Sequence, residues 1–259
     1  MEYLDIDSAR KHTSLRLVLT AGVPGPWGEA AKGIFRVKKI AYTPVSQQGG
    51  GENAELLAWT GHDNAPIVMV EGEPPRTVWS EILFFAERRE REPALIPADA
   101  SDRALMFGLA HELCGEQGLG WSRRLMMVDE VLGVPALADS PAGDLVRRLG
   151  DKYGYCPDAA AAAPARAVEI LGTLSAQLRE QHRRGSRFLI GDALSALDIY
   201  WAAFAALVNP LPHEQCPMPE FLRVQYDVKH PLVRAAVDSR LLEHRDFIYA
   251  ESLGLPLNF

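Results

Sequence analysis

The segment Asn64–Arg91, which reads NAPIVMVEGEPPRTVWSEILFFAERRER, decides how the rest of the chain is interpreted. Its short apolar run Ile67–Val70 predicts a buried strand. A proline directly before a central strand is uncommon, because proline cannot donate to the hydrogen-bond ladder. Its presence favours a cis peptide between Ala65 and Pro66.

A turn and a helix complete this segment. Glu71–Pro75 contains one glycine and two prolines, which predicts a tight connection between two strands. A second short strand over 76–78 then leads into a helix from Ser80, and we expect the Ser80 hydroxyl to cap that helix.

The residues before this segment alternate between strand and helix patterns. Residues 1–14 are polar and are expected to form a surface arm. The spacing of apolar residues predicts strands over 15–19 and 40–45 and helices over 26–39 and 54–59. Together with the segment above, the order is βαβαββα, the order of a thioredoxin-like domain.

The second half of the chain has a helical pattern throughout. A proline-containing linker over 92–100 precedes it. Helices are predicted from 101 through 113 and onward with Ser101 as the cap, over 141–149, over 164–184 and over 199–208. The run Ala159–Ala163 before the third of these is either the N-terminus of that helix or a loop. Ser195 and Asp198 have the spacing of a capping box at the start of the last helix, which is apolar on nearly all sides and therefore expected to be buried.

Composition limits the classes of function. The chain has 259 residues and a net charge of −7, which argues against a nucleic-acid or anionic-membrane partner. No apolar run is long enough to span a membrane, and the acidic N-terminus does not resemble a signal peptide. The three cysteines and seven histidines show no metal-ligand spacing, and we expect no metal and a reducing, cytoplasmic location.

Two parts of the chain resemble the cytosolic glutathione transferases. Ala65-Pro66 followed by a hairpin and a hydroxyl-acid pair resembles the glutathione-binding half of that family. The segment 188–198 resembles its C-terminal motif FLxGDx[ST]xAD, with Leu197 where the family usually has alanine. The resemblance runs from about Leu15 to Val208. It implies an α/β plus all-α fold, with a thioredoxin-like glutathione-binding domain over 12–92 and an all-α substrate domain over 100–259.

The resemblance also implies a function. The expected protein is a homodimeric detoxification enzyme that conjugates glutathione, as co-substrate, to an electrophilic small molecule. It implies that glutathione pairs with the backbone at Ala65, beside Pro66. Its γ-glutamyl end would then lie at the start of the next helix, with Ser80 binding the carboxylate and Glu81 the ammonium group.

The register of this last pair is open. The family's pair falls at Ser80-Glu81, at Thr77-Val78 or at Trp79-Ser80. Arg76 is a second candidate for a glutathione carboxylate. The alternative for Ser80 and Glu81 is a local role, as a helix cap and a solvated acid in the first turn.

The chain departs from the family beside the sulfur. Gly25-Pro26-Trp27 falls on the family's Ser-Pro-Phe or Cys-Pro-Phe triplet, so that glycine replaces the activating side chain. Two sources of thiolate stabilisation remain: the hydroxyl of Thr20, which otherwise only ends its strand, and the backbone N–H groups of Trp27 and Gly28. The alternative function is a glutathione-binding or interaction module without catalysis.

The pocket for the electrophile is expected in the helical half. The stretch 110–124 combines polar residues and glycines in what the pattern predicts as a plain helix. Its residues form either a pocket wall, with Trp121, Arg123, Arg124 and His111 as candidates, or a helix that bends at its glycines and turns a polar face to solvent.

Overall fold

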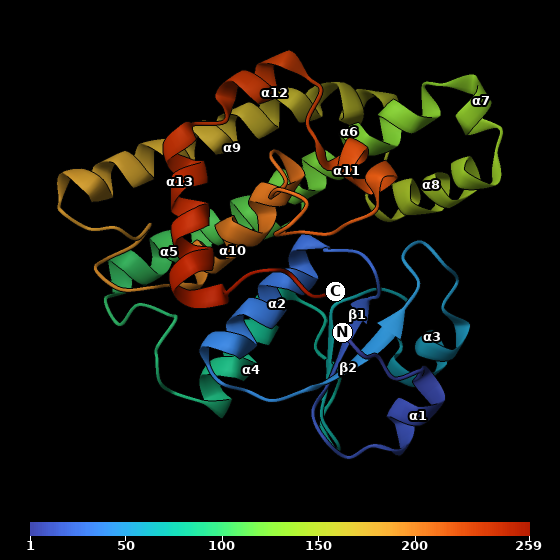
Figure 1. The fold of residues 1–259 in the computed structure, drawn as a ribbon, viewed down its shortest axis with the longest axis horizontal. Coiled ribbons are helices and arrows are strands. Elements are labelled where there is room, and N and C mark those ends of the chain that lie inside the picture. The colour runs from blue at the N-terminus through green and yellow to red at the C-terminus, as the bar shows by residue number, and fades with distance from the viewer.

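A three-stranded mixed sheet forms the centre of the N-terminal half (Figure 1). In this computed structural model, which describes residues 1–259, β1 (Arg16–Thr20) is the middle strand. It pairs in parallel with β2 (Thr43–Gln47) and antiparallel with β3 (Ile67–Met69). This topology, with helices on the sheet, is the thioredoxin-like arrangement that the sequence predicts.

Two predictions about strands need correction. The second hairpin strand is reduced to one pair, Val68 with Arg76, whose two N–H···O distances are 2.9 and 3.1 Å. The register would next pair Pro66 with Val78 and Pro74 with Val70, and neither proline has an N–H to donate. The second strand begins at Thr43, not at residue 40.

The beginning of the chain is ordered, contrary to the prediction of a surface arm. Leu4 pairs with Val45 as an additional edge of the sheet. A short helix α1 (Ile6–Lys11) follows, and the Asp5 carboxylate caps it by accepting from the Ser8 N–H at 2.7 Å. The apolar side of α1, with Ile6 buried, packs on the sheet.

Three helices complete the N-terminal half: α2 (Pro26–Val37), α3 (Ala54–Thr60) and α4 (Trp79–Arg89). The Lys38 C-cap and a left-handed Lys39 end α2, and the Ile40 N–H returns to the carbonyl of Phe35 at 2.8 Å. Residue 40 therefore belongs to the end of the helix, which explains why β2 starts later than predicted. Helix α4 starts one residue before Ser80 with Val78 at the N-cap position, so Ser80 lies in the first turn and is not the cap.

The second half of the chain is all helical, as predicted, and forms the layer above the sheet (Figure 1). Its elements are α5 (Ala100–Cys114), α6 (Leu119–Leu132), α7 (Pro135–Ala138), α8 (Pro141–Lys152), α9 (Pro157–Arg183), α10 (Ala196–Phe204), η1 (Ala205–Leu207), α11 (Glu220–Tyr226), α12 (Pro231–Ala236), α13 (Ser239–Ile248) and the π-helical turn η2 (Tyr249–Leu253).

One predicted helix start is wrong, and a second, left open by the sequence, is resolved. Helix α5 is capped by the carboxylate of Asp99, which accepts from the N–H groups of Ser101 and Asp102, so Ser101 is inside the helix. Helix α9 begins at Pro157 and continues through Pro164. The run Ala159–Ala163 is therefore the N-terminal part of this helix and not a loop, in keeping with the high helix propensity of alanine.

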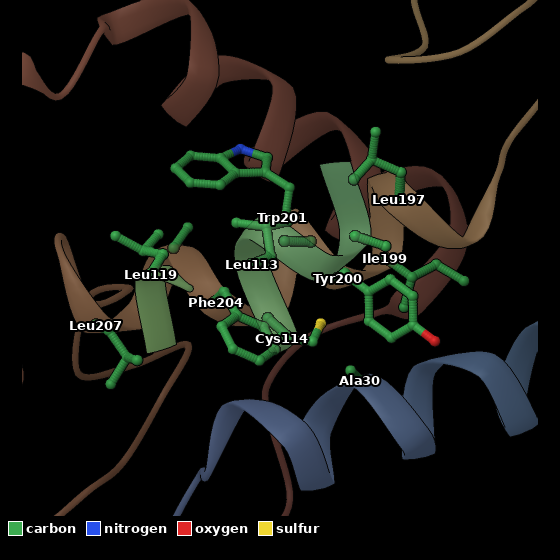
Figure 2. Packing of buried hydrophobic residues seen from close by; sticks show 14 of the residues in the cluster. Ala30, Leu113, Cys114, Leu119, Leu197, Ile199, Tyr200, Trp201, Phe204 and Leu207 are labelled. Carbon is green, nitrogen blue, oxygen red and sulfur yellow. The ribbon is translucent and has the colours of Figure 1, made fainter. Parts of the chain in front are cut away.

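Helix α10 connects the two halves of the molecule. All nine of its residues are buried, and one hydrophobic cluster extends from α5 and α9 through α10 to α2 and α4. Figure 2 shows Tyr200 and Phe204 of α10, with Cys114 of α5, facing Ala30 on α2. A Cβ on Gly33 of α2 would lie 2.8 Å from Ile199, so the small residue allows this close approach.

The capping box at the start of α10 is present and larger than predicted. The buried Asp198 carboxylate accepts from the Ser195 N–H, the Ser195 hydroxyl and the Leu189 N–H, each at 2.8 Å. The Nε2 atom of His244 on α13 lies 2.9 Å from the same carboxylate. Asp198 thus joins α10, α13 and the preceding loop, and it stabilises the element that docks on α2.

We expect Asp198→Ala to lower the free energy of unfolding by about 3 kcal/mol, since it removes a cap and leaves several buried donors without an acceptor. Asp99→Ala at the exposed cap of α5 is the matched control and should cost only about 1 kcal/mol. Urea denaturation measures both. Equal losses in the two variants would contradict the role assigned to Asp198.

Candidate functional site

A cleft of about 780 Å³ lies between the thioredoxin-like half and the helical half. On one side its walls come from the end of β1, the start of α2, the loop after β2 and the residues before β3. On the other side they come from α6, α8 and α11. Of the residues predicted to form the site, the cleft brings together Thr20, Trp27, Ala65 and Arg124.

The backbone at Ala65 presents an open edge to this cleft. The Ala65–Pro66 peptide is cis, as predicted, and Pro66 is buried at the entrance of β3. Neither the N–H nor the C=O of Ala65 forms a hydrogen bond within the protein. An extended peptide placed alongside can therefore form strand-like hydrogen bonds here.

The start of α2 supplies further unpaired N–H groups. Its N-cap is Gly25, which has no capping side chain, and the first helical bond runs from the Glu29 N–H to the Gly25 carbonyl at 2.8 Å. The N–H groups of Trp27 and Gly28 have no partner in the protein. Because a helix N-terminus also carries a positive partial charge, this end of the cleft favours an anion.

The side chain of Trp27 is not available to a ligand in the same way as its backbone. Its indole N–H donates to the carbonyl of Cys114 at 2.9 Å, and its ring packs edge-on against Phe204. A Cβ on Gly120 would lie 2.7 Å from the indole, so this glycine leaves room for the ring. Trp27 therefore fixes the start of α2 against the helical half.

Thr20 is oriented by a chain of side-chain hydrogen bonds. The Gln47 side-chain N–H₂ donates to the Thr20 hydroxyl oxygen. The Asn53 side-chain N–H₂ donates in turn to the side-chain carbonyl oxygen of Gln47 at 3.0 Å. Because the Thr20 oxygen already accepts a hydrogen bond, its own proton is free to be donated into the cleft. No local sequence pattern points to Gln47 or Asn53. The register that places Gln47 opposite Thr20 in the sheet is the only signal for them.

Only two charged side chains line the cleft, Glu29 and Arg124. Burial raises the pKa of the Glu29 carboxyl, and the Lys32 ammonium group 2.8 Å away opposes this shift. Arg124 forms no ion pair, and its guanidinium lies over the ring of Tyr226 at 5.7 Å. The cleft is therefore nearly free of competing charge.

The cysteines offer no nucleophile in the cleft. Cys114 is buried, and this burial raises the pKa of its thiol well above the usual value. Cys216 is also buried, and Cys156 is exposed at the start of α9, where its sulfur caps the helix.

No three His, Cys, Asp or Glu side chains lie close enough together to hold a metal ion. None of the helices combines the length and the apolar character that a membrane span requires.

The other predicted residues of the glutathione site lie outside the cleft. Ser80 is partly buried and Glu81 exposed in the first turn of α4. Arg76 forms an ion pair with Glu73 and lies over the ring of Phe85 at 4.8 Å. The N–H groups of residues 79–81 have no partner, because the first backbone bond of α4 runs from the Ile82 N–H to the carbonyl of residue 78.

The glycine-rich stretch 110–124 is two helices and not one. Helix α5 ends at Cys114, and α6 begins after Gly118, so the chain bends at its glycines. His111 is exposed, and the Trp121 indole donates to the Tyr153 carbonyl at 2.9 Å. Of the four side chains predicted there as a pocket wall, only Arg124 lines the cleft.

Arg123, the neighbour of Arg124, has a structural role. It is fully buried, and its Nε–H donates to the carbonyl of Leu207 at 2.7 Å. Burial lowers the pKa of its guanidinium to about 10. Two adjacent arginines on α6 therefore face different surroundings, and sequence alone did not separate them.

Helix α8 contacts the thioredoxin-like half at two points beside the cleft. Leu145 packs against Gly50, where an added Cβ would lie 2.7 Å from the leucine. Lys152 forms an ion pair with Asp63 at 2.9 Å. These contacts set the distance between the two walls on this side.

No protein-family model matches the chain, and no curated protein is similar to it in sequence. Solved structures do match nearly its whole length. A glutathione S-transferase domain-containing protein from Marinobacter aquaeolei VT8 is 18% identical with a TM-score of 0.62, and the match covers 91% of this chain and 98% of that one.

Two further matches have similar extent. Glutathione transferase Omega 3C from Trametes versicolor is 15% identical with a TM-score of 0.57, over 96% of this chain and 90% of that one. Maleylacetoacetate isomerase from Methylobacterium extorquens AM1, solved with bound malonate and GSH, is 18% identical with a TM-score of 0.53, over 89% and 94%. The chain therefore has the fold of the glutathione transferases, a thioredoxin-like half followed by an all-helical half.

Proposed function

We propose that this protein is a glutathione transferase, which joins the sulfur of glutathione to an electrophilic small molecule. The observation that carries the proposal is the unpaired backbone of Ala65 in the same cleft as the open N-terminus of α2. An extended, anionic thiol peptide matches both features. The fold supports the same conclusion, since a maleylacetoacetate isomerase of this fold has been solved with GSH bound.

Glutathione is placed with its cysteine residue along Ala65, next to Pro66. Its γ-glutamyl end then extends toward the start of α4, where three unpaired N–H groups favour a carboxylate. Ser80 and Glu81 are the side chains we assign to this end, and Arg76 is the nearby cation for a second carboxylate. The cleft itself does not include these three residues, so this part of the assignment rests on α4.

The chemistry consists of stabilising a thiolate. An unperturbed thiol has a pKa of about 8.5 and reacts only after it loses its proton. The Thr20 hydroxyl and the N–H groups of Trp27 and Gly28 donate toward the sulfur position, and the thiol proton leaves to solvent. The thiolate then forms a bond to carbon and displaces a leaving group or adds to a double bond. Helix-end donors of this kind contribute about 0.3–2 kcal/mol, or roughly one pKa unit.

A non-catalytic glutathione-binding module is the second candidate, and Gly25 favours it. A Cβ at Gly25 would meet no atom within 4 Å, so the position has room for a serine or cysteine that the chain does not have. Binding without a lowered thiol pKa is the behaviour expected of such a module.

A second copy of the chain is the partner we assign to an apolar patch on α4 and α5. Phe84 is 54% exposed and stacks on Phe107 of α5 with ring centroids 5.3 Å apart. Since the patch includes both halves of the molecule, a homodimer formed there would also fix the two halves relative to each other. The free thiols are compatible with the cytoplasm, where we place the protein.

We expect glutathione to bind with a lowered thiol pKa, by about one unit, because helix-end donors favour the thiolate. Calorimetry measures the binding, and the ultraviolet absorbance of the thiolate as a function of pH measures the pKa. S-methylglutathione, which has no ionisable thiol, is the control for the absorbance. An unshifted thiol would favour the module, and the absence of binding would contradict both candidates.

We expect Thr20→Val to raise the pKa of the bound thiol by about half a unit to one unit and to lower kcat/KM about 3- to 10-fold, the value of one hydrogen bond. Thr43→Val is the matched control, because the Thr43 hydroxyl pairs with Ser14 outside the cleft and its loss should change neither quantity. Glutathione affinity should be similar in both variants. A Thr20→Val protein with an unchanged thiol pKa would leave the helix amides as the only donors.

We expect Phe84→Asp to convert a dimer into a monomer, since a carboxylate at the centre of the patch must be desolvated on association. Light scattering after gel filtration measures the mass. Leu232→Asp on α12 is the control, because Leu232 is 65% exposed and distant from the patch in sequence and fold. Dissociation by the control variant instead would place the interface on α12.

A further inference from the structure

Arg124 is the only cationic side chain that lines the cleft, and it has no acidic partner. It comes from α6 in the helical wall and is partly buried, and its Nη1 lies 3.8 Å from the Met127 sulfur. Burial lowers the pKa of its guanidinium, but the phenol groups of Tyr226 and Tyr153 outweigh this effect and raise the pKa. Its Nε–H is fully buried and has no acceptor in the protein. The Nη2 group forms no hydrogen bond by the same geometry, so the N–H groups at the end of the guanidinium remain to bind a ligand in the cleft.

The remaining wall around Arg124 is apolar or uncharged. Glu29, the other charged residue of the cleft, is neutralised by Lys32 at 2.8 Å. Besides Arg124, the helical side is lined by Ala142, Leu145, Val146 and Leu149 from α8, by Tyr153, and by Phe221, Leu222 and Gln225 from α11, of which only Gln225 and Tyr153 carry polar side-chain groups. Phe221 is 69% exposed at the edge of this wall. An apolar surface that ends in a single unpaired guanidinium matches a molecule with an apolar body and one oxyanion group.

We propose that Arg124 binds the oxyanion of the second substrate, so that the electrophile is an apolar molecule bearing a carboxylate or sulfonate group. This inference rests on the proposed function and names its substrate class. The partners proposed for glutathione lie on the thioredoxin-like wall, at Ala65 and the start of α2, and outside the cleft at the start of α4. Arg124 lies on the wall built by the helical half. It therefore orients the substrate while the reacting carbon faces the sulfur.

Two fluorescent probes with one skeleton test this assignment. 1-Anilinonaphthalene-8-sulfonate carries an oxyanion, and N-phenyl-1-naphthylamine is the same molecule without it. We expect the protein to bind the sulfonate more tightly than the amine. In Arg124→Gln the sulfonate affinity should fall about 10- to 100-fold, because hydrogen bonds to a charged group are lost, while the amine affinity changes less than about 2-fold.

The control variants separate this effect from general electrostatics and from folding. Arg148→Gln removes an exposed charge from α8 outside the cleft and should leave both probes unaffected. Arg124→Lys keeps the charge but not the planar fork, and should lose part of the sulfonate affinity. If Arg124→Gln does not fold, the preference of the unmodified protein for the sulfonate, and its reduction in Arg124→Lys, decide the case.

Each outcome has a defined meaning. Equal affinity of the unmodified protein for both probes overturns the proposal. So does an equal loss of affinity for both probes in Arg124→Gln, because Arg124 would then only shape the wall of the cleft. A parallel loss of glutathione affinity, measured by calorimetry, assigns Arg124 to glutathione and also overturns it. If glutathione does not bind but the sulfonate effect remains, the proposed function fails and the oxyanion site stands.

Discussion

The packing of α10 against α2 is the contact on which the candidate site depends. Helix α2 carries the open amide end at Gly25, and α10 holds it in place from the helical side. Glycines at 33 and 120 allow the two layers to approach closely, and the Trp27 ring fills the space beside Gly120. The Asp198 network in turn fixes the start of α10. The capping motif around Asp198 therefore helps to position the backbone donors at the start of α2, although the motif itself contacts no ligand.

Local patterns made the fold predictable from sequence. The apolar spacing, the proline before β3 and the Ser195–Asp198 box each depend on neighbours a few residues away, and the structure confirms the order of strands and helices that they indicate. Errors occurred at element ends, where contacts outside the element decide. The apolar pattern extends the second strand to residue 40, whose N–H instead closes α2, and it does not decide whether Ala159–Ala163 is helix or loop, a run that α9 includes.

The site was only partly predictable, because its polar contacts are distant in sequence. Thr20, Ala65 and Arg124 were identified, but the chain from Thr20 through Gln47 to Asn53 depends on which strands pair. Arg123 and Arg124 have the same side chain and adjacent positions. Only the packed helices show that one serves the core and the other the cleft. Gly25 was visible in the sequence, and the structure adds that the space beside it is open.

The contacts between α8 and the thioredoxin-like half decide how firmly the cleft is closed on that side. On that side the walls are joined by one leucine against a glycine loop and by the Lys152–Asp63 ion pair, whose two side chains are partly exposed. A solvent-exposed pair of this kind contributes only about 0–1 kcal/mol. Separating α8 from Asp63 therefore costs little compared with the energy of binding a small molecule. On this side the two walls are therefore held together mainly by the contact of Leu145 with Gly50.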